Sequence, residues 1–237
     1  MTERGNSNLT RNNVVRRIEH IFKMIVDRTT LIDTNPFEKV QKLKTTVSFQ
    51  HVAFSAEDQI KVETAIQERN PELYFFTRFM YYCFTRVEET LKLKVSNIDV
   101  KKRILTVYSV VQKTSITLNK VIPTKLWNMI QERGILDLPS DYYIFGSGLK
   151  PSLVPSGLNY PANKTRDILK ELGLYKPNYY SLYSFRHTGI DRMIENNVDV
   201  DLVDLQNHIG HQKIETTINY TKARKLRISR KLEDRDW

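Results

Sequence analysis

The chain has 237 residues, of which 40% are hydrophobic and 27% are charged, a balance typical of a soluble globular protein with a hydrophobic core. The formal net charge of +10 favours a polyanionic partner, most simply nucleic acid, although a ribosomal, membrane-surface or merely very soluble protein would have a similar charge. A single cysteine, Cys83, excludes an intrachain disulfide and a thiolate metal cluster, and the sequence shows neither a secretory signal nor an apolar stretch long enough to span a bilayer, so we expect a cytoplasmic protein.

The first predicted element is a helix in the stretch NNVVRRIEHIFKMIVDRTTLI, where apolar residues recur at helical spacing over 14–26. Asn12 or Asn13 is its predicted N-cap, and Asn35-Pro36 is expected to prevent its continuation. Because one amphipathic helix cannot bury its stripe alone, it is interpreted as the end of an N-terminal domain or as a packing arm. The next stretch, EKVQKLKTTVSFQHV, is predicted to be a polar, basic linker.

From about residue 50 the pattern predicts one α+β domain, mostly helical, with a small antiparallel sheet. Ser55 is a predicted N-cap, with Asp58 as a capping-box-like partner. Two β-branched runs, 104–111 and 115–122, flank QKT and predict a β-hairpin with Lys113 at its tip. The predicted helices cover 56–69, 73–85, a segment soon after Arg86, 123–133, 162–172, 187–196 and 200–208.

Polar residues with unusual surroundings occur in four places along this domain. They are Arg86 at the end of an aromatic helix, Lys113, the group Tyr183, Arg186 and His187, and the group His208, His211 and Tyr220. Each has an ordinary alternative reading: a surface ion pair, a turn lysine, a histidine at a helix end or a packed tyrosine. No single one of them predicts an activity.

Taken in order, these residues resemble the catalytic domain of the tyrosine recombinase, or phage-type integrase, family. The family pattern joins an Arg in T-G-[LM]-R-x-x-E, a hairpin Lys, an H-x-L-R-H-T box and L-G-H-x-x-x-x-x-T-x-x-Y. Here FTRVEE supplies Arg86, VVQKTS supplies Lys113, YSFRHT supplies Arg186, and IGHQKIETTINY supplies His211 and Tyr220. The first position of the box is Tyr183 instead of His, which we interpret as a variation also found in other integrase-like sequences.

The resemblance covers roughly residues 50–225 and implies two parts. Residues 1–48 are expected to be the C-terminal remnant of a core-binding, SAM-like domain with its linker, and residues 49–237 the catalytic domain. Family members carry a longer N-terminal portion, so the chain is expected to be shortened there.

The resemblance also implies a reaction, site-specific DNA cleavage and rejoining through a 3′-phosphotyrosyl intermediate, for a mobile element. In it Tyr220 is the nucleophile, Arg86 and Arg186 hold the phosphate, and His211 donates a further hydrogen bond. Lys113 is the general acid, and Tyr183 occupies the remaining catalytic position. No metal, ATP or other cofactor is expected.

The expected partner is double-stranded DNA, on which the family forms tetramers, with a monomer possible in its absence. Basic residues that could contact backbone phosphates are Lys101, Lys102, Arg103, Lys164 and Arg166. The basic tail KARKLRISRKLEDRDW is expected either to pack on a neighbouring protomer or to form a solvated helix on its own subunit.

Three other functions would account for parts of this pattern. A type IB topoisomerase would use similar residues to relax supercoils, and a DNA-binding module with a vestigial site would agree with Tyr183 and the shortened N-terminus. A metal-dependent nuclease or relaxase would use His187, His208 and His211, with Tyr179 and Tyr180 as nucleophiles. The two residues between the histidines of HIGH, and the lack of a suitably spaced acidic partner, disfavour it.

Overall fold

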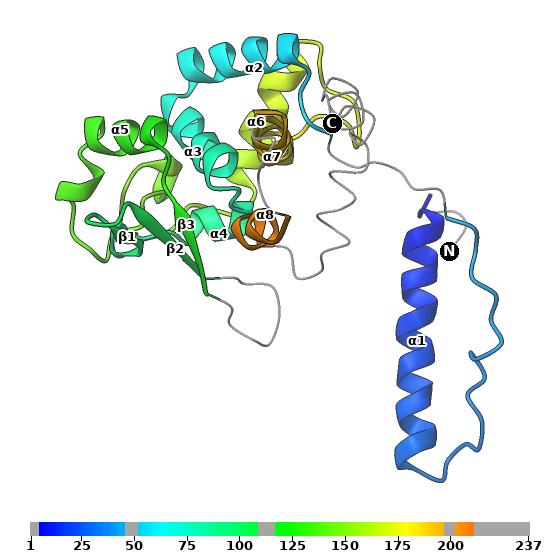
Figure 1. Cartoon of the computed structure of the whole chain (residues 1–237). Helices are drawn as coiled ribbons and strands as arrows, with labels where there is room; N and C mark the ends of the chain where they lie inside the picture. The colour runs from blue at the N-terminus through cyan, green and yellow to red at the C-terminus, as the bar shows by residue number, and fades with distance from the viewer. Residues whose placement is uncertain (1–4, 46–51, 109–116, 197–201, 211–237) are drawn as a thin grey trace, which may run out of the picture. The chain divides into compact units, whose positions relative to one another are not determined.

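The computed structural model describes residues 5–45, 52–108, 117–196 and 202–210. The chain divides into two compact units, Met1–Ser48 and Phe49–Trp237 (Figure 1). Whether the first unit is the remnant of a core-binding domain stays a prediction. Within the described ranges, no helix combines the length and the apolar character that a bilayer crossing requires.

The first unit contains one helix, α1 (Asn8–Arg28), and an extended segment that returns along it. The predicted N-cap was wrong, because the Ser7 hydroxyl accepts a hydrogen bond from the Thr10 amide and so starts the helix earlier. Asn12 is buried instead, and its side-chain amide exchanges two hydrogen bonds with the backbone of Leu43, at 2.8 and 2.9 Å. The first part of the predicted linker, as far as Leu43, is therefore fixed against α1.

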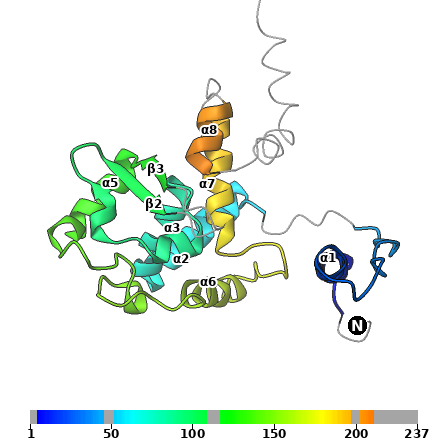
Figure 2. The same cartoon turned by 90° about the horizontal axis from the view of Figure 1, so that it is seen from below.

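The second unit is mostly helical with a small antiparallel sheet, which confirms the predicted fold class. Its elements are α2 (Ala56–Arg69), α3 (Pro71–Tyr82), α4 (Val87–Leu91), η2 (Val95–Asn97), β1 (Ile98–Asp99), β2 (Ile104–Tyr108), β3 (Thr117–Val121), α5 (Thr124–Glu132), η3 (Ile135–Asp137), η4 (Ser147–Leu149), α6 (Tyr160–Glu171), α7 (Tyr183–Asn196) and α8 (Leu202–Ile209). Helix α3 lies centrally, with the sheet and α5 on one side and α7 on the other (Figures 1 and 2).

Helix α3 forms the centre of the core because large apolar residues occur on most of its faces. Phe75, Phe76 and Phe79 are fully buried, and all three rings contact Phe145 at centroid distances of 5.0 to 5.5 Å. The helix ends at Tyr82, three residues before the predicted end. Phe84 adopts a positive φ of 49°, which an α-helix cannot contain, so the chain turns there towards α4.

The predicted hairpin is confirmed in its described part. Strand β2 pairs antiparallel with β3, from Ile104 opposite Val121 to Tyr108 opposite Thr117. The predicted tip with Lys113 lies outside the described residues. The short strand β1, which pairs with the other edge of β2, was not predicted.

Helix α7 packs closely against α3, and the contact depends on Gly189. A Cβ placed at Gly189 would lie 2.0 Å from the backbone oxygen of Tyr81, far inside the contact distance.

We expect Gly189→Ala to destabilise the fold by about 1–3 kcal/mol, since rigid backbone on α3 would have to move. Chemical denaturation would measure the loss. Gly157→Ala is the matched control, because a Cβ there meets nothing within 4 Å. Equal stability of the two variants would contradict this account of the α3–α7 contact.

Candidate active site

Arg86 is the N-cap residue of α4, and not the end of the aromatic helix as predicted. Its side chain is held by Glu89, whose carboxylate is almost fully buried. The guanidinium Nη1 donates to Glu89 Oε1 at 2.8 Å, and the Arg86 amide donates to Glu89 Oε2 at 2.8 Å. One buried carboxylate therefore closes the start of the helix and orients the arginine, while the guanidinium stays partly exposed.

Arg186 lies in the first turn of α7 and is buried. Its Nη1 donates to the carbonyl of Phe84, the residue at positive φ, and its Nη2 donates to the carbonyl of Ile209 at 3.0 Å. The helix starts at Tyr183, earlier than predicted, because the Ser181 hydroxyl accepts a hydrogen bond from the Tyr183 amide at 3.1 Å. This early start places Arg186 on α7 at the turn between α3 and α4.

The end of α8 brings the two arginines together. Arg186 donates to the Ile209 carbonyl, and Arg86 Nη2 lies 3.4 Å from the next carbonyl, that of Gly210. Gly210 has a φ of 79°, and a Cβ there would lie 2.5 Å from Leu118 Cδ1 on β3, so glycine is the residue that ends the helix in this way with the least strain. The two guanidinium groups thus donate hydrogen bonds to consecutive carbonyl groups, those of Ile209 and Gly210.

Lys120, on β3, is a site residue that the sequence analysis missed. Its side chain is fully buried, and its Nζ donates to the carbonyl of His208 on α8. Burial, and after it the charge of the nearby Arg186 guanidinium, lowers the pKa of Lys120 to about 8. The available signal was its position: Lys120 is two residues from both Leu118 and Ile122, so its side chain lies on the same, inward face of the strand as theirs.

His208, in the last turn of α8, lies beside Lys120 and Phe84. Its ring packs edge-on against Phe84, at 5.3 Å between centroids, and burial followed by the charge of Lys120 lowers its pKa to about 4. It is therefore neutral at physiological pH. Among the described residues, histidine, cysteine and acidic side chains form no group of three that could hold a metal ion.

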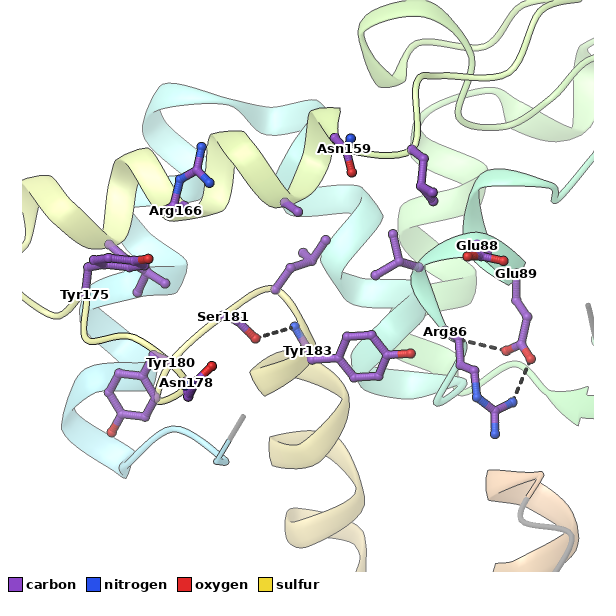
Figure 3. Close-up of a pocket in the computed structure, with 15 residues that line it drawn as sticks. Arg86, Glu88, Glu89, Asn159, Arg166, Tyr175, Asn178, Tyr180, Ser181 and Tyr183 are labelled. Atoms are coloured by element: carbon purple, nitrogen blue, oxygen red, sulfur yellow. Dashed lines mark hydrogen bonds and ion pairs between the residues drawn. The ribbon is translucent and has the colours of Figure 1, made fainter. Parts of the chain in front are cut away.

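A pocket of about 550 Å³ opens beside Arg86 (Figure 3). The ring of Tyr183 extends from the start of α7 towards Arg86 and forms part of its wall, and Arg166 lines it from α6. The structure thus brings together Arg86, Arg186 and Tyr183 of the predicted catalytic residues. Lys113, His211 and Tyr220 lie outside the described residues.

The predicted phosphate-contacting residues occupy two separate elements. Lys101, Lys102 and Arg103 are exposed in the turn between β1 and β2, where the Arg103 guanidinium lies over the Trp127 ring at 5.2 Å. Lys164 and Arg166 are exposed on α6. Of the five, the one that lines the pocket beside Arg86 is Arg166, so the others remain candidates for more distant contacts.

Solved structures with the same fold include two DNA-bound integrases and a recombinase. The Tn1549 transposon integrase in complex with a circular intermediate DNA matches with a TM-score of 0.73 and 17% identity, over 97% of this chain and 81% of that chain. A lambda integrase dimer bound to a COC′ core site matches with a TM-score of 0.72 and 15% identity, over 97% and 61%. The XerA recombinase matches with a TM-score of 0.62 and 18% identity, over 99% and 80%.

A search of the curated proteins found no match. The model of the phage integrase family matches residues 55–227, which is most of the second unit and well over half of the chain. This range contains the three residues that the structure brings together and the three that lie outside its described part. The chain therefore belongs to the phage integrase family and is a site-specific recombinase of the tyrosine class.

Proposed function

We propose that this chain cleaves and rejoins double-stranded DNA at specific sites through a 3′-phosphotyrosyl intermediate, in the service of a mobile element. The observation that carries the proposal is the convergence of Arg86 and Arg186 on the end of α8, directly before His211 in the sequence. Such a pair of planar cations suits the non-bridging oxygens of a phosphodiester.

The charge of the site supports an anionic substrate. Arg86, Arg186 and Lys120 lie around the end of α8, and Glu89 is the buried carboxylate beside them. Three cations against one carboxylate leave an excess of positive charge, which a DNA phosphate would neutralise. The same charge would favour the phenolate of a nearby tyrosine, whose formation at pH 7 otherwise costs about 4 kcal/mol.

The proposed cleavage step conserves the number of phosphoester bonds. The Tyr220 hydroxyl first loses its proton to water; its oxygen then attacks the phosphorus, a tyrosyl–phosphate bond forms at the 3′ end, and the bond from phosphorus to the 5′ oxygen breaks. Lys113 gives the leaving 5′ oxygen its proton, and His211 donates a hydrogen bond to the phosphate. Arg86 and Arg186 stabilise the charge on the non-bridging oxygens, and Tyr183 lies in the pocket wall beside them. The reverse reaction rejoins a new 5′ hydroxyl.

Glu89 is expected to act through Arg86. In Glu89→Gln the orienting carboxylate becomes a neutral amide, so the Arg86 fork loses its charge-assisted partner. We expect cleavage to fall about 10- to 100-fold, the equivalent of about 1.5–3 kcal/mol. Single-turnover cleavage of a DNA site would measure it, with Glu68→Gln, an exposed residue of α2 that does not line the pocket, as the control. Equal rates in the two variants would show that Arg86 needs no such support.

The proposal extends to assembly and location. We infer a tetramer on DNA, in which two sites are cleaved and exchanged, and a cytoplasmic enzyme. The first unit, residues 1–48, would belong to a core-binding domain, and the tail 222–237 would pack on a neighbouring protomer. Lys101, Lys102, Arg103, Lys164 and Arg166 would contact DNA phosphates, which predicts an affinity that falls as salt rises.

The test of the function is to trap the covalent intermediate. A DNA site nicked near the cleavage position loses its 5′ fragment, so rejoining is prevented and the protein–DNA complex accumulates. Digestion and mass spectrometry should then find a 3′-phosphoryl group on Tyr220. The reaction should proceed in EDTA, since no metal takes part. Absence of a covalent complex on DNA that the protein binds would favour a DNA-binding module, and relaxation of supercoils without exchange of sites would favour a topoisomerase.

A further inference from the structure

Three cations meet the end of α8 on three consecutive carbonyl groups. Lys120 donates to the carbonyl of His208, Arg186 to that of Ile209 at 3.0 Å, and Arg86 to that of Gly210 at 3.4 Å. The last carbonyls of a helix have no partner within the helix, and they carry partial negative charge. The cations come from β3, from α7 and from the N-cap of α4, so this helix end joins three separate parts of the unit (Figures 1 and 2).

Lys120 is the member of this group that the cleavage step does not use. Its ammonium is fully buried, and within the described part of the chain it forms no ion pair with a carboxylate. The charged and titratable groups around it are Arg186, Cys83, Glu89, Arg86 and His208. A buried ammonium is costly, and an apolar residue could fill the same inward position between Leu118 and Ile122. The charge therefore needs a reason beyond packing.

We propose that Lys120 is a positioning residue for DNA cleavage. By holding the His208 carbonyl, it fixes the last turn of α8, so that the Ile209 and Gly210 carbonyls align Arg186 and Arg86. It also fixes the point from which the chain continues to His211. The lowered pKa of Lys120, to about 8, is consistent with a buried group that remains protonated at neutral pH. The inference rests on the proposed function.

The first test is Lys120→Met, which removes the charge and keeps the length of the side chain. We expect the single-turnover rate of cleavage at saturating DNA to fall about 10- to 100-fold, because small displacements of catalytic groups have effects of this size. The Kd for DNA should stay within about twofold and the Tm within about 4 °C, since the lost hydrogen bond is offset by removal of a buried charge. Lys125→Met, the same change at an exposed lysine, should cleave like the wild type.

The second test separates positioning from proton donation. In a DNA site with sulfur in place of the bridging 5′ oxygen, the bond from phosphorus to sulfur breaks and a thiolate leaves without a proton. Lys113→Met, which lacks the proposed general acid, should regain nearly the wild-type rate on this substrate. Lys120→Met should remain slow by the same factor on both substrates, because its ammonium does not serve the leaving group.

Several outcomes would overturn the inference. A wild-type rate in Lys120→Met would make Lys120 a buried charge without a role in catalysis. A rate restored by the sulfur substrate would make it a proton donor. A lowered Tm and weaker DNA binding, with an unchanged rate at saturation, would make its role purely structural. A wild-type protein that forms no covalent complex on either substrate is a different result, which would refute the proposed function itself.

Discussion

Replacing Tyr220 with phenylalanine is expected to abolish the covalent protein–DNA complex and recombination, while leaving DNA affinity unchanged. Phenylalanine keeps the ring but has no oxygen with which to form a phosphodiester, so no slower version of the same route remains. The complex formed on a nicked DNA site would be measured by denaturing gel electrophoresis, and affinity by titration under the same salt.

Tyr179 provides a matched control for this experiment. Tyr179 is 42% exposed, and with Tyr180 it was the nucleophile in the relaxase hypothesis. Tyr180 is unsuitable for that role, since its hydroxyl donates to Asp58 Oδ2 at 2.8 Å and accepts from the Ser55 amide at 3.2 Å, which anchors the start of α2. We expect Tyr179→Phe to form the complex at the wild-type rate. A complex that survives in Tyr220→Phe and is lost in Tyr179→Phe would reverse the assignment.

Elements with a strong period or a local cap could be predicted from the sequence. The Ser55 cap and the apolar spacing after it predicted 56–69, and α2 has those bounds. The two β-branched runs, 104–111 and 115–122, predicted the hairpin. These signals are local, because the residues that determine each element lie within it.

The geometry around Arg86 could not be predicted in the same way. Aromatic residues continue past Tyr82, so the apolar pattern favours a longer helix. The chain turns instead at Phe84, with a positive φ, and the Phe84 carbonyl accepts from Arg186, a hundred residues later. Tertiary hydrogen bonds of this kind compensate local strain and leave no local signal. Motif order therefore predicted that Arg86 and Arg186 lie close together, but not how they are held.

Lys120 was missed for a different reason. Its inward position in the strand could be read from the sequence, but lysine is not expected in such a position. Lysine in a strand is usually an exposed residue that protects a sheet edge. For this reason Lys113, at the predicted hairpin tip, was chosen as the candidate instead of Lys120. The inward phase of Lys120 relative to Leu118 and Ile122 contradicts that expectation. A charged residue in the inward phase of a short strand is a reason to look for a polar partner across the core.

Replacing Arg186 with lysine is expected to lower DNA cleavage by about 10²–10³-fold, the loss typical of removing one donor that stabilises transition-state charge. Lysine keeps the positive charge, but the guanidinium fork bridges the carbonyls of Phe84 and Ile209, which a single ammonium cannot span in the same geometry. Rates at saturating DNA would be compared with those of Arg192→Lys, on the same helix, whose partner is the nearby Glu195 at 2.9 Å. The Tm of both variants would show whether the fold is retained. A wild-type rate in Arg186→Lys would mean that charge alone suffices at this position, and the fixed orientation of the two guanidinium groups would then have no part in catalysis.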